Sequence, residues 1–248
     1  MLKRALASLA GLVAVAAAAS ACAPGAEAEP DDAADVAEAL TPGSVGAMIL
    51  SPRCSTTVVR GLTDQLVDEL KCLAPGALSR IDGIPGVELD PDAYPWLQTP
   101  AARSLAAAQR DLGQTIKVNS ALRTLPQQYL LYRWYRNDRC GISLAAKVGE
   151  SNHEEGLAVD LDSHGPTIRR GMARHSYEWL GASDAVHFDY KGDDGVAIQG
   201  ASVRAFKRLW NRNHPDKKLP VNDTYDAKTE AYLKESPADG FPIGARCD

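Results

Sequence analysis

The 248-residue sequence has few bases and few cysteines, and each shortage argues against a class of function. Its 27 Lys and Arg residues are outnumbered by 32 acids, which gives a formal net charge of −5. A general nucleic-acid binder needs a basic stripe, so this class is excluded. The five cysteines include no Cys-x-x-Cys pair, which argues against a cysteine-rich metal site. No Gly-x-Ser-x-Gly run supports a Ser-His-Asp nucleophile.

Long apolar runs are also scarce, and the one that exists lies near the start, between Ala5 and Ala19. It follows Lys3 and Arg4 and leads through small residues to Cys22, a pattern typical of an export signal. A cleavage site ending in Cys resembles a bacterial lipobox, in which Cys22 is lipidated. An ordinary secretory signal is the alternative, and the run is short for a membrane-spanning helix. We expect an exported lipoprotein that is anchored to a membrane and faces the periplasm or cell wall.

The composition changes after the predicted signal of residues 1–21. Residues 22–48 contain six acids and no base, and they have too little apolar surface to fold alone. We predict that they form an acidic disordered tether. The remaining 26 acids face 25 bases, so the body that begins at residue 49 is nearly neutral.

Four cysteines remain besides Cys22, namely Cys54, Cys72, Cys140 and Cys247. An even number in an exported chain predicts two disulfides, with three possible connectivities. We favour Cys54–Cys72, which are close in sequence, and therefore Cys140–Cys247, which would tie the C-terminus to the body.

Hydrophobic periodicity predicts a mixed order of helices and strands in the body. Thr99 and Pro100 are typical of a helix N-cap and first helical residue. Residues 50–98 show no pattern that we can place, and no internal repeat is evident. The fold class we expect is α+β, a small antiparallel sheet flanked by helices. The expected helices cover residues 99–112, 126–135, 168–180, 202–212 and 226–234, and the expected strands cover 116–121, 157–161 and 186–190.

Two of the five histidines, His153 and His187, lie near carboxylates in a pattern that can hold a metal ion. Together with Asp160 they would supply two imidazoles and one carboxylate, leaving a fourth tetrahedral position for water. Seven residues separate His153 from Asp160, and a turn at Gly156 would let the histidine reach back to the following strand. On spacing alone, a structural role for each histidine remains open.

The motifs around these residues resemble the zinc D,D-peptidases, which include D-Ala-D-Ala carboxypeptidases, vancomycin-resistance dipeptidases and endolysin L-Ala-D-Glu peptidases. The resemblance covers roughly residues 99–192. It is carried by Ser151-x-His153-x-x-Gly156-x-Ala158-x-Asp160, by Asp184-x-x-His187, and by the Ser-x-x-Arg-Thr block at Ser120–Thr124.

The resemblance implies one Zn²⁺ per chain, bound by His153, Asp160 and His187. It assigns Asp184 as the general base and Arg123 as the residue that binds the scissile carbonyl oxygen. Ser151 and Gln128 would support the ligands or contact substrate. Glu154 and Glu155 are rival bases, although His153-Glu154 does not continue as His-Glu-x-x-His. We expect His164, His175 and His214 to be surface or supporting residues.

The segment after residue 192 resembles a shortened peptidoglycan-binding module. The resemblance lies in residues 203–211 and 229–233. Lys207 stands where such modules usually carry Gln, and Asn222, Asp223 and Asp226 stand near their Asp-Gly and later Gly. The alternative is a helix that packs on the catalytic domain. We therefore divide the chain into a signal (1–21), a tether (22–48), a catalytic domain (49–192) and a C-terminal helical segment (193–248).

These observations predict a lipid-anchored zinc D,D-carboxypeptidase that acts on peptidoglycan stem peptides. Two alternatives stay open: an endopeptidase that cuts L-Ala-D-Glu or a cross-bridge, and a non-catalytic wall-binding protein. The expected partners are stem peptides and a membrane, with no nucleic acid.

Overall fold

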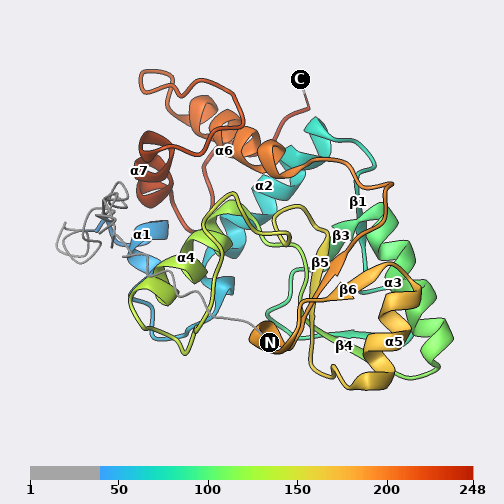
Figure 1. Ribbon diagram of the computed structural model, residues 1–248. Helices are drawn as coiled ribbons and strands as arrows, with labels where there is room; N and C mark the ends of the chain where they lie inside the picture. The colour runs from blue at the N-terminus through green and yellow to red at the C-terminus, as the bar shows by residue number, and fades with distance from the viewer. Residues whose placement is uncertain (1–39, 248) are drawn as a thin grey trace, which may run out of the picture. The chain divides into compact units, whose positions relative to one another are not determined.

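The computed structural model describes residues 40–247 and is mixed in secondary structure, with helices and two small sheets (Figure 1). The predicted signal, Cys22 and most of the tether lie outside the described residues. Within the described part, no helix has the length and apolar character needed to cross a membrane. The elements in chain order are α1 Val45–Met48, η2 Thr56–Val59, α2 Arg60–Leu73, β1 Leu78–Arg80, β2 Val87–Leu89, β3 Trp96–Gln98, α3 Thr99–Leu112, β4 Ile116–Ser120, α4 Leu125–Arg136, β5 Ala158–Leu161, α5 Pro166–Arg174, β6 Tyr177–Trp179, η3 Ala182–Asp184, β7 His187–Tyr190, α6 Gln199–Asn213 and α7 Ala227–Glu235.

The larger sheet has five strands in the order β2-β4-β5-β7-β6. Three of its neighbouring pairs are antiparallel, whereas β2 and β4 run parallel, so the predicted all-antiparallel sheet is wrong at this edge. Helices α3 and α5 lie side by side and pack on one face (Figure 1). Val159, Phe188 and Leu105 belong to the hydrophobic core between these layers. Side chains of β5 and β7 that point to the opposite face of the sheet lie outside this core.

A second core joins α2 and α4 to the C-terminal helices. It contains Leu66, Trp134, Phe206 and Trp210, which are all almost completely buried. The boundary predicted at residue 192 therefore crosses a continuous apolar core. This packing matches the alternative that the C-terminal helices pack on the body.

Most predicted elements are present, and the largest error concerns residues 168–180. The helix there ends at Arg174, because Ser176 adopts a left-handed backbone with φ of +61° and the chain turns into β6. Strand β6 pairs with β7 at the sheet edge. Helix α3 begins at Thr99 itself, with Gln98 in the cap position, one residue earlier than predicted.

The predicted disulfide connectivity is wrong. The bonds join Cys54 to Cys140 and Cys72 to Cys247. Cys54 precedes α2, whereas Cys72 lies in its last turn. A helix rises about 1.5 Å per residue, so the twelve residues from Arg60 to Cys72 span about 18 Å. Disulfide-bonded Cα atoms are at most about 7 Å apart, so a helix of this length separates two cysteines that are close in sequence.

Candidate metal centre

Asp160 and His187 face each other across two paired strands. In the β5–β7 ladder, Asp160 is the direct partner of His187, and Val159 is the partner of Phe188. Successive side chains of a strand point to opposite faces. Since Val159 and Phe188 face the core below α3 and α5, Asp160 and His187 must project from the other face.

His153 reaches the same place from the turn that precedes β5. Gly156 adopts a φ of +65°, which favours glycine, and its amide donates to the carbonyl of His153. The amide of Arg123 donates to the same carbonyl. Nδ1 of His153 lies 2.7 Å from the carbonyl oxygen of Ala121, which leaves Nε2 to face the site. The turn predicted at Gly156 is confirmed.

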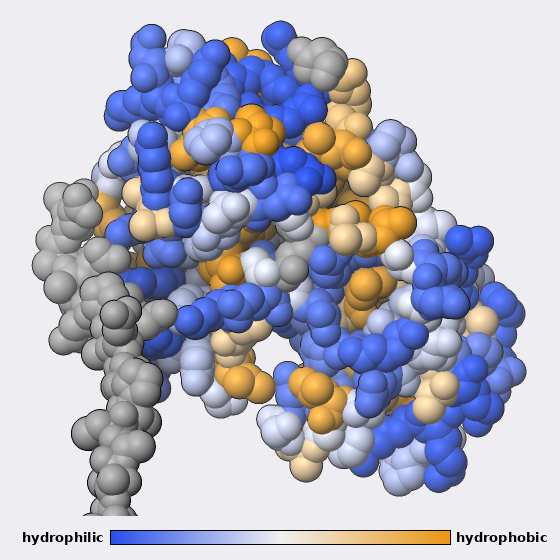
Figure 2. Space-filling model, turned by 45° about the horizontal axis from the view of Figure 1, so that its top comes forward, coloured by the Kyte–Doolittle hydropathy of each residue, from blue (hydrophilic) through white to orange (hydrophobic). Residues whose placement is uncertain are grey.

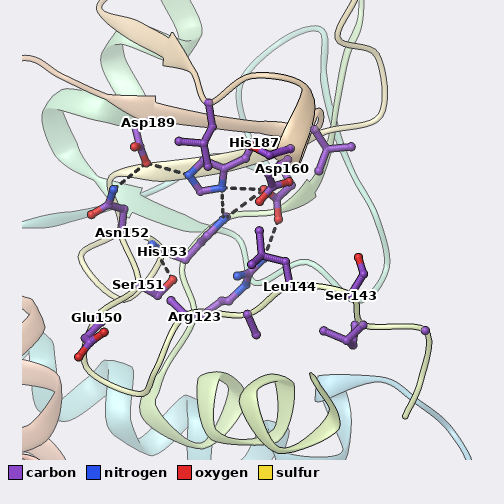
Figure 3. Close-up of a pocket in the computed structure, with 18 residues that line it drawn as sticks. Arg123, Ser143, Leu144, Glu150, Ser151, Asn152, His153, Asp160, His187 and Asp189 are labelled. Carbon is purple, nitrogen blue, oxygen red and sulfur yellow. Dashed lines mark hydrogen bonds and ion pairs between the residues drawn. The ribbon is translucent and has the colours of Figure 1, made fainter. Parts of the chain in front are cut away.

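The three predicted ligands present one atom each to a common point (Figure 3). Nε2 of His153 lies 3.2 Å from Oδ1 of Asp160 and 3.2 Å from Nδ1 of His187. The third side, from Nδ1 of His187 to Oδ1 of Asp160, is 3.1 Å. A tetrahedron with metal–ligand bonds of about 2.0 Å has edges of about 3.3 Å. The donor set and its spacing therefore fit a metal ion with three protein ligands and an open position.

Asp189 is a functional candidate that the sequence interpretation missed. Its Oδ1 lies 2.8 Å from Nε2 of His187, and it also accepts from Nδ2 of Asn152 at 2.8 Å. Lys191 donates to its Oδ2 at 3.0 Å. This carboxylate fixes the ring of His187 so that Nδ1 faces Asp160. The alternation of β7 offered a signal, because Asp189 lies two residues after His187 on the same face.

The pKa values of the ligands follow from burial and close charges. Burial and the nearby Arg123 lower the pKa of His153. Burial opposes ionisation of Asp160, but the charge of His153 and hydrogen bonds from both imidazoles hold its pKa well below the usual range. Burial also lowers the pKa of His187, yet its bonds to Asp160 and Asp189 outweigh this and raise it to about 9. Asp160 is thus an anion, as a metal ligand requires.

Arg123 lies directly beside the ligands. Its Nη2 donates to Oδ2 of Asp160 at 2.6 Å, and its Nε donates to Oγ of Ser120 at 3.0 Å. Both bonds fix the guanidinium, and Nη1 is left to donate to a bound molecule.

An open cleft of about 480 Å³ lies over the ligands. Of the remaining predicted site residues, Asp184 and Ser151 line this cleft, whereas Gln128 does not. Oγ of Ser151 accepts from the amide of His153, so this serine supports a ligand's backbone. Figure 3 shows the labelled residues that surround the cleft. A loop over residues 141–146 forms one wall.

Gln128 supports the loop over residues 141–146 through a hydrogen bond to its backbone. It is fully buried in α4, and its Nε2 donates to the carbonyl oxygen of Ala146 at 2.8 Å. At the other end of the loop, Cys140 is bonded to Cys54. The loop is therefore held at both ends.

The rival bases and the other histidines lie elsewhere. Glu154 is buried with its Oε2 on the amide of Gly149, and burial raises its pKa to about 8. Glu155 accepts from the amide of Ile198. Neither lines the cleft. The remaining histidines have other neighbours: the His164 carbonyl accepts from Arg169, His175 bonds to Asp111, and His214 stacks on Trp210.

In the C-terminal segment, the residues that depart from the binding-module pattern have structural partners. Lys207 donates from Nζ to Oδ1 of Asn222 and to the carbonyl of Thr224, both at 2.6 Å. Asp226 caps α7 by accepting from the amide of Thr229. These side chains stabilise the connection between α6 and α7.

Comparison with known proteins adds no identification. The chain matches no family model, and a search of curated proteins finds no match. The resemblance to zinc D,D-peptidases therefore rests on the motif residues alone.

Proposed function

We propose that this protein is a zinc peptidase that hydrolyses peptidoglycan stem peptides. The observation that carries the proposal is the triangle of His153, Asp160 and His187 in a cleft that also holds Asp184 and Arg123. The cleft size is typical of sites that take small ligands or short peptides. The same two-histidine, one-carboxylate donor set also suits iron(II), so metal analysis is part of the test.

Bound zinc would supply a water with a pKa of about 7 and polarise the scissile carbonyl. Asp184 takes a proton from the attacking water and returns it to the departing amine. Arg123 donates from Nη1 to the carbonyl oxygen, where negative charge develops. One such donor contributes about 3 kcal/mol to transition-state stabilisation. Asp189 holds His187 in one orientation throughout.

Two positions of cleavage are open within this proposal. The motifs favour removal of a terminal D-alanine, the D,D-carboxypeptidase reaction. Internal cleavage is favoured by the charge of the cleft, because Arg123 is the one arginine or lysine among its described lining residues and is already paired with Asp160. A carboxypeptidase has to accommodate a second carboxylate, that of its substrate's C-terminus.

The decisive experiment combines metal analysis with a product assay. Purified protein should contain about one zinc per chain, and His153→Ala should lose it. Incubation with a muropeptide pentapeptide, followed by mass spectrometry, should show either loss of one alanine or an internal cut. Asp184→Ala should keep zinc and fold but hydrolyse little. Zinc-loaded protein that cleaves no stem peptide would contradict the proposal and favour a wall-binding role.

A further inference from the structure

The two histidines of the metal centre come from different parts of the fold. His187 belongs to β7, whereas His153 lies in the turn before β5. Asn152 directly precedes His153, and its side chain contacts the carboxylate that orients His187. One turn therefore carries one ligand and also reaches the support of the other.

The side chain of Asn152 shares an acceptor atom with His187. Its Nδ2 donates to Oδ1 of Asp189 at 2.8 Å, and the same Oδ1 lies 2.8 Å from Nε2 of His187. Both contacts are drawn in Figure 3, where they meet at Asp189. Hydrogen bonds to a carboxylate are stronger than those between neutral groups. Asn152 therefore restricts the position of the oxygen that faces the imidazole.

The backbone of Asn152 is itself held in place. Its carbonyl oxygen accepts from the amide of Leu157 at 3.1 Å, which closes the turn on the C-terminal side. On the N-terminal side, Oε2 of the buried Glu154 accepts from the amides of Gly149 at 2.9 Å and Ser151 at 3.4 Å. The asparagine side chain thus extends from a fixed backbone.

An exposed asparagine is not by itself a sign of function on this protein. The face drawn in Figure 2 is mainly hydrophilic, with small apolar patches. Asn152 is exposed too, but it lines the cleft and its acceptor belongs to a buried carboxylate. Removal of an exposed side chain leaves no buried cavity, so its effect on the metal centre can be measured separately from packing.

We propose that Asn152 is a positioning residue that couples the two imidazoles. Its hydrogen bond joins the turn that carries His153 to Asp189, which orients His187. A metal ion therefore meets both nitrogen ligands in one fixed arrangement. The proposal rests on the metal centre of the proposed function, and it does not require that the protein hydrolyses a peptide.

A double-mutant cycle tests whether Asn152 acts through Asp189. The four proteins are the wild type, Asn152→Ala, Asp189→Ala and the double variant, and competition with a chromophoric chelator gives the dissociation constant for zinc. Asn152→Ala should weaken zinc binding about tenfold, as is typical of groups that support metal ligands. In the Asp189→Ala background the same change should have no effect, because the acceptor is gone.

The matched control is Asn137→Ala. Asn137 also donates from Nδ2 at 2.8 Å, but to the carbonyl of Arg133 and outside the cleft lining. This change should leave zinc affinity as in the wild type. An equal loss from Asn152→Ala in both backgrounds would show that the asparagine only stabilises its turn, and would overturn the proposal. Unchanged affinity in Asn152→Ala would overturn it as well.

A spectrum tests Asn152 without any change at Asp189. The visible absorption of the cobalt(II)-loaded protein should change in Asn152→Ala and not in Asn137→Ala, because only the former frees the imidazole of His187 to reorient. Identical spectra for all three proteins would contradict the proposal.

Metal binding and turnover separate this proposal from the peptidase function. A non-additive cycle in a protein that cleaves no stem peptide would support the role of Asn152 and refute the peptidase. Cleavage of stem peptides together with an additive cycle would refute the role of Asn152 alone. A wild type that binds no zinc would refute both.

Discussion

At the scale of single residues, the contact between Asp189 and His187 decides which imidazole nitrogen faces the metal position. Asp189→Asn keeps the size of the side chain but removes the negative charge from the 2.8 Å contact with Nε2. We expect metal affinity to fall about 10- to 100-fold while the fold is retained. Competition with a chromophoric chelator measures the dissociation constant. Asp162→Asn, an exposed change outside the cleft, is the control. Equal affinity in both variants would show that Asp189 does not tune the site.

The buried carboxyl group of Glu154 should make the free energy of unfolding depend on pH. Burial raises the pKa of this carboxyl to about 8, above its ordinary value of 4.5. Between these values the folded state binds more protons than the unfolded state, so the free energy of unfolding falls as pH rises from about 4.5 to about 8. Glu154→Gln cannot ionise and should lack this loss. Urea unfolding at pH 5, 7 and 9, with chelator present, compares the two proteins. Parallel pH profiles would contradict the prediction.

The residues of the candidate metal centre were largely predictable from the sequence. His153, Asp160 and His187 were found through motif spacing, and the turn at Gly156 explains why that spacing works. Asp189 was missed because the motif ends at His187. Gln128 was expected near the ligands, yet its contact is with the loop backbone, and no local pattern specifies such a long-range hydrogen bond.

At the scale of elements, the loop over residues 141–146 is a part of the cleft that lies outside helices and strands. Its support comes from the Cys54–Cys140 bond at one end and from Gln128 at the other.

The local sequence predicted helices more clearly than it predicted this loop. In α4, for example, Thr124 and Gln127 form a capping box. The end of α5 at Arg174 was missed because the apolar period continues through residues that belong to β6.

Loss of the Cys54–Cys140 bond should loosen this wall and leave the metal ligands in place. We expect the double variant Cys54→Ser/Cys140→Ser to lose about 2–4 kcal/mol of stability, to raise KM several-fold and to bind zinc normally. Steady-state kinetics and metal analysis provide the measurements. Cys72→Ser/Cys247→Ser is the matched control, since that bond lies away from the cleft lining and should change stability without changing KM. Identical KM values in both double variants would refute a positioning role.

At the scale of the molecule, Glu69 connects parts that are distant in sequence. It is fully buried in α2 and pairs with Arg208 and Arg212 of α6, and it accepts from the amide of Arg246. Glu69→Ala would remove the buried carboxylate that both guanidinium groups contact. We expect a loss of about 3–5 kcal/mol, measured by urea unfolding. Glu235→Ala, an exposed change on α7, should cost little. A small loss for Glu69→Ala would show that α6 is held mainly by its apolar face.

The global arrangement was less predictable than the elements. The mixed fold class follows from the order of elements, but the parallel pairing of β2 and β4 and both disulfides join segments that are distant in sequence. Residues 50–98 gave no usable pattern, since their three strands have only three residues each. The shared core of Leu66 and Phe206 also joins segments that the sequence presented as separate.

The pairing of Asp160 with His187 in the β5–β7 ladder has a practical consequence. Strand hydrogen bonds hold these two residues opposite each other, so the backbone pairing restricts where their donor atoms can lie. We therefore expect that a metal ion bound here can be exchanged while the protein stays folded. We expect that the proposed zinc ion can be removed with a chelator and replaced by cobalt(II) without refolding. The visible absorption of cobalt would then report the coordination of the centre directly, in the absence of any substrate.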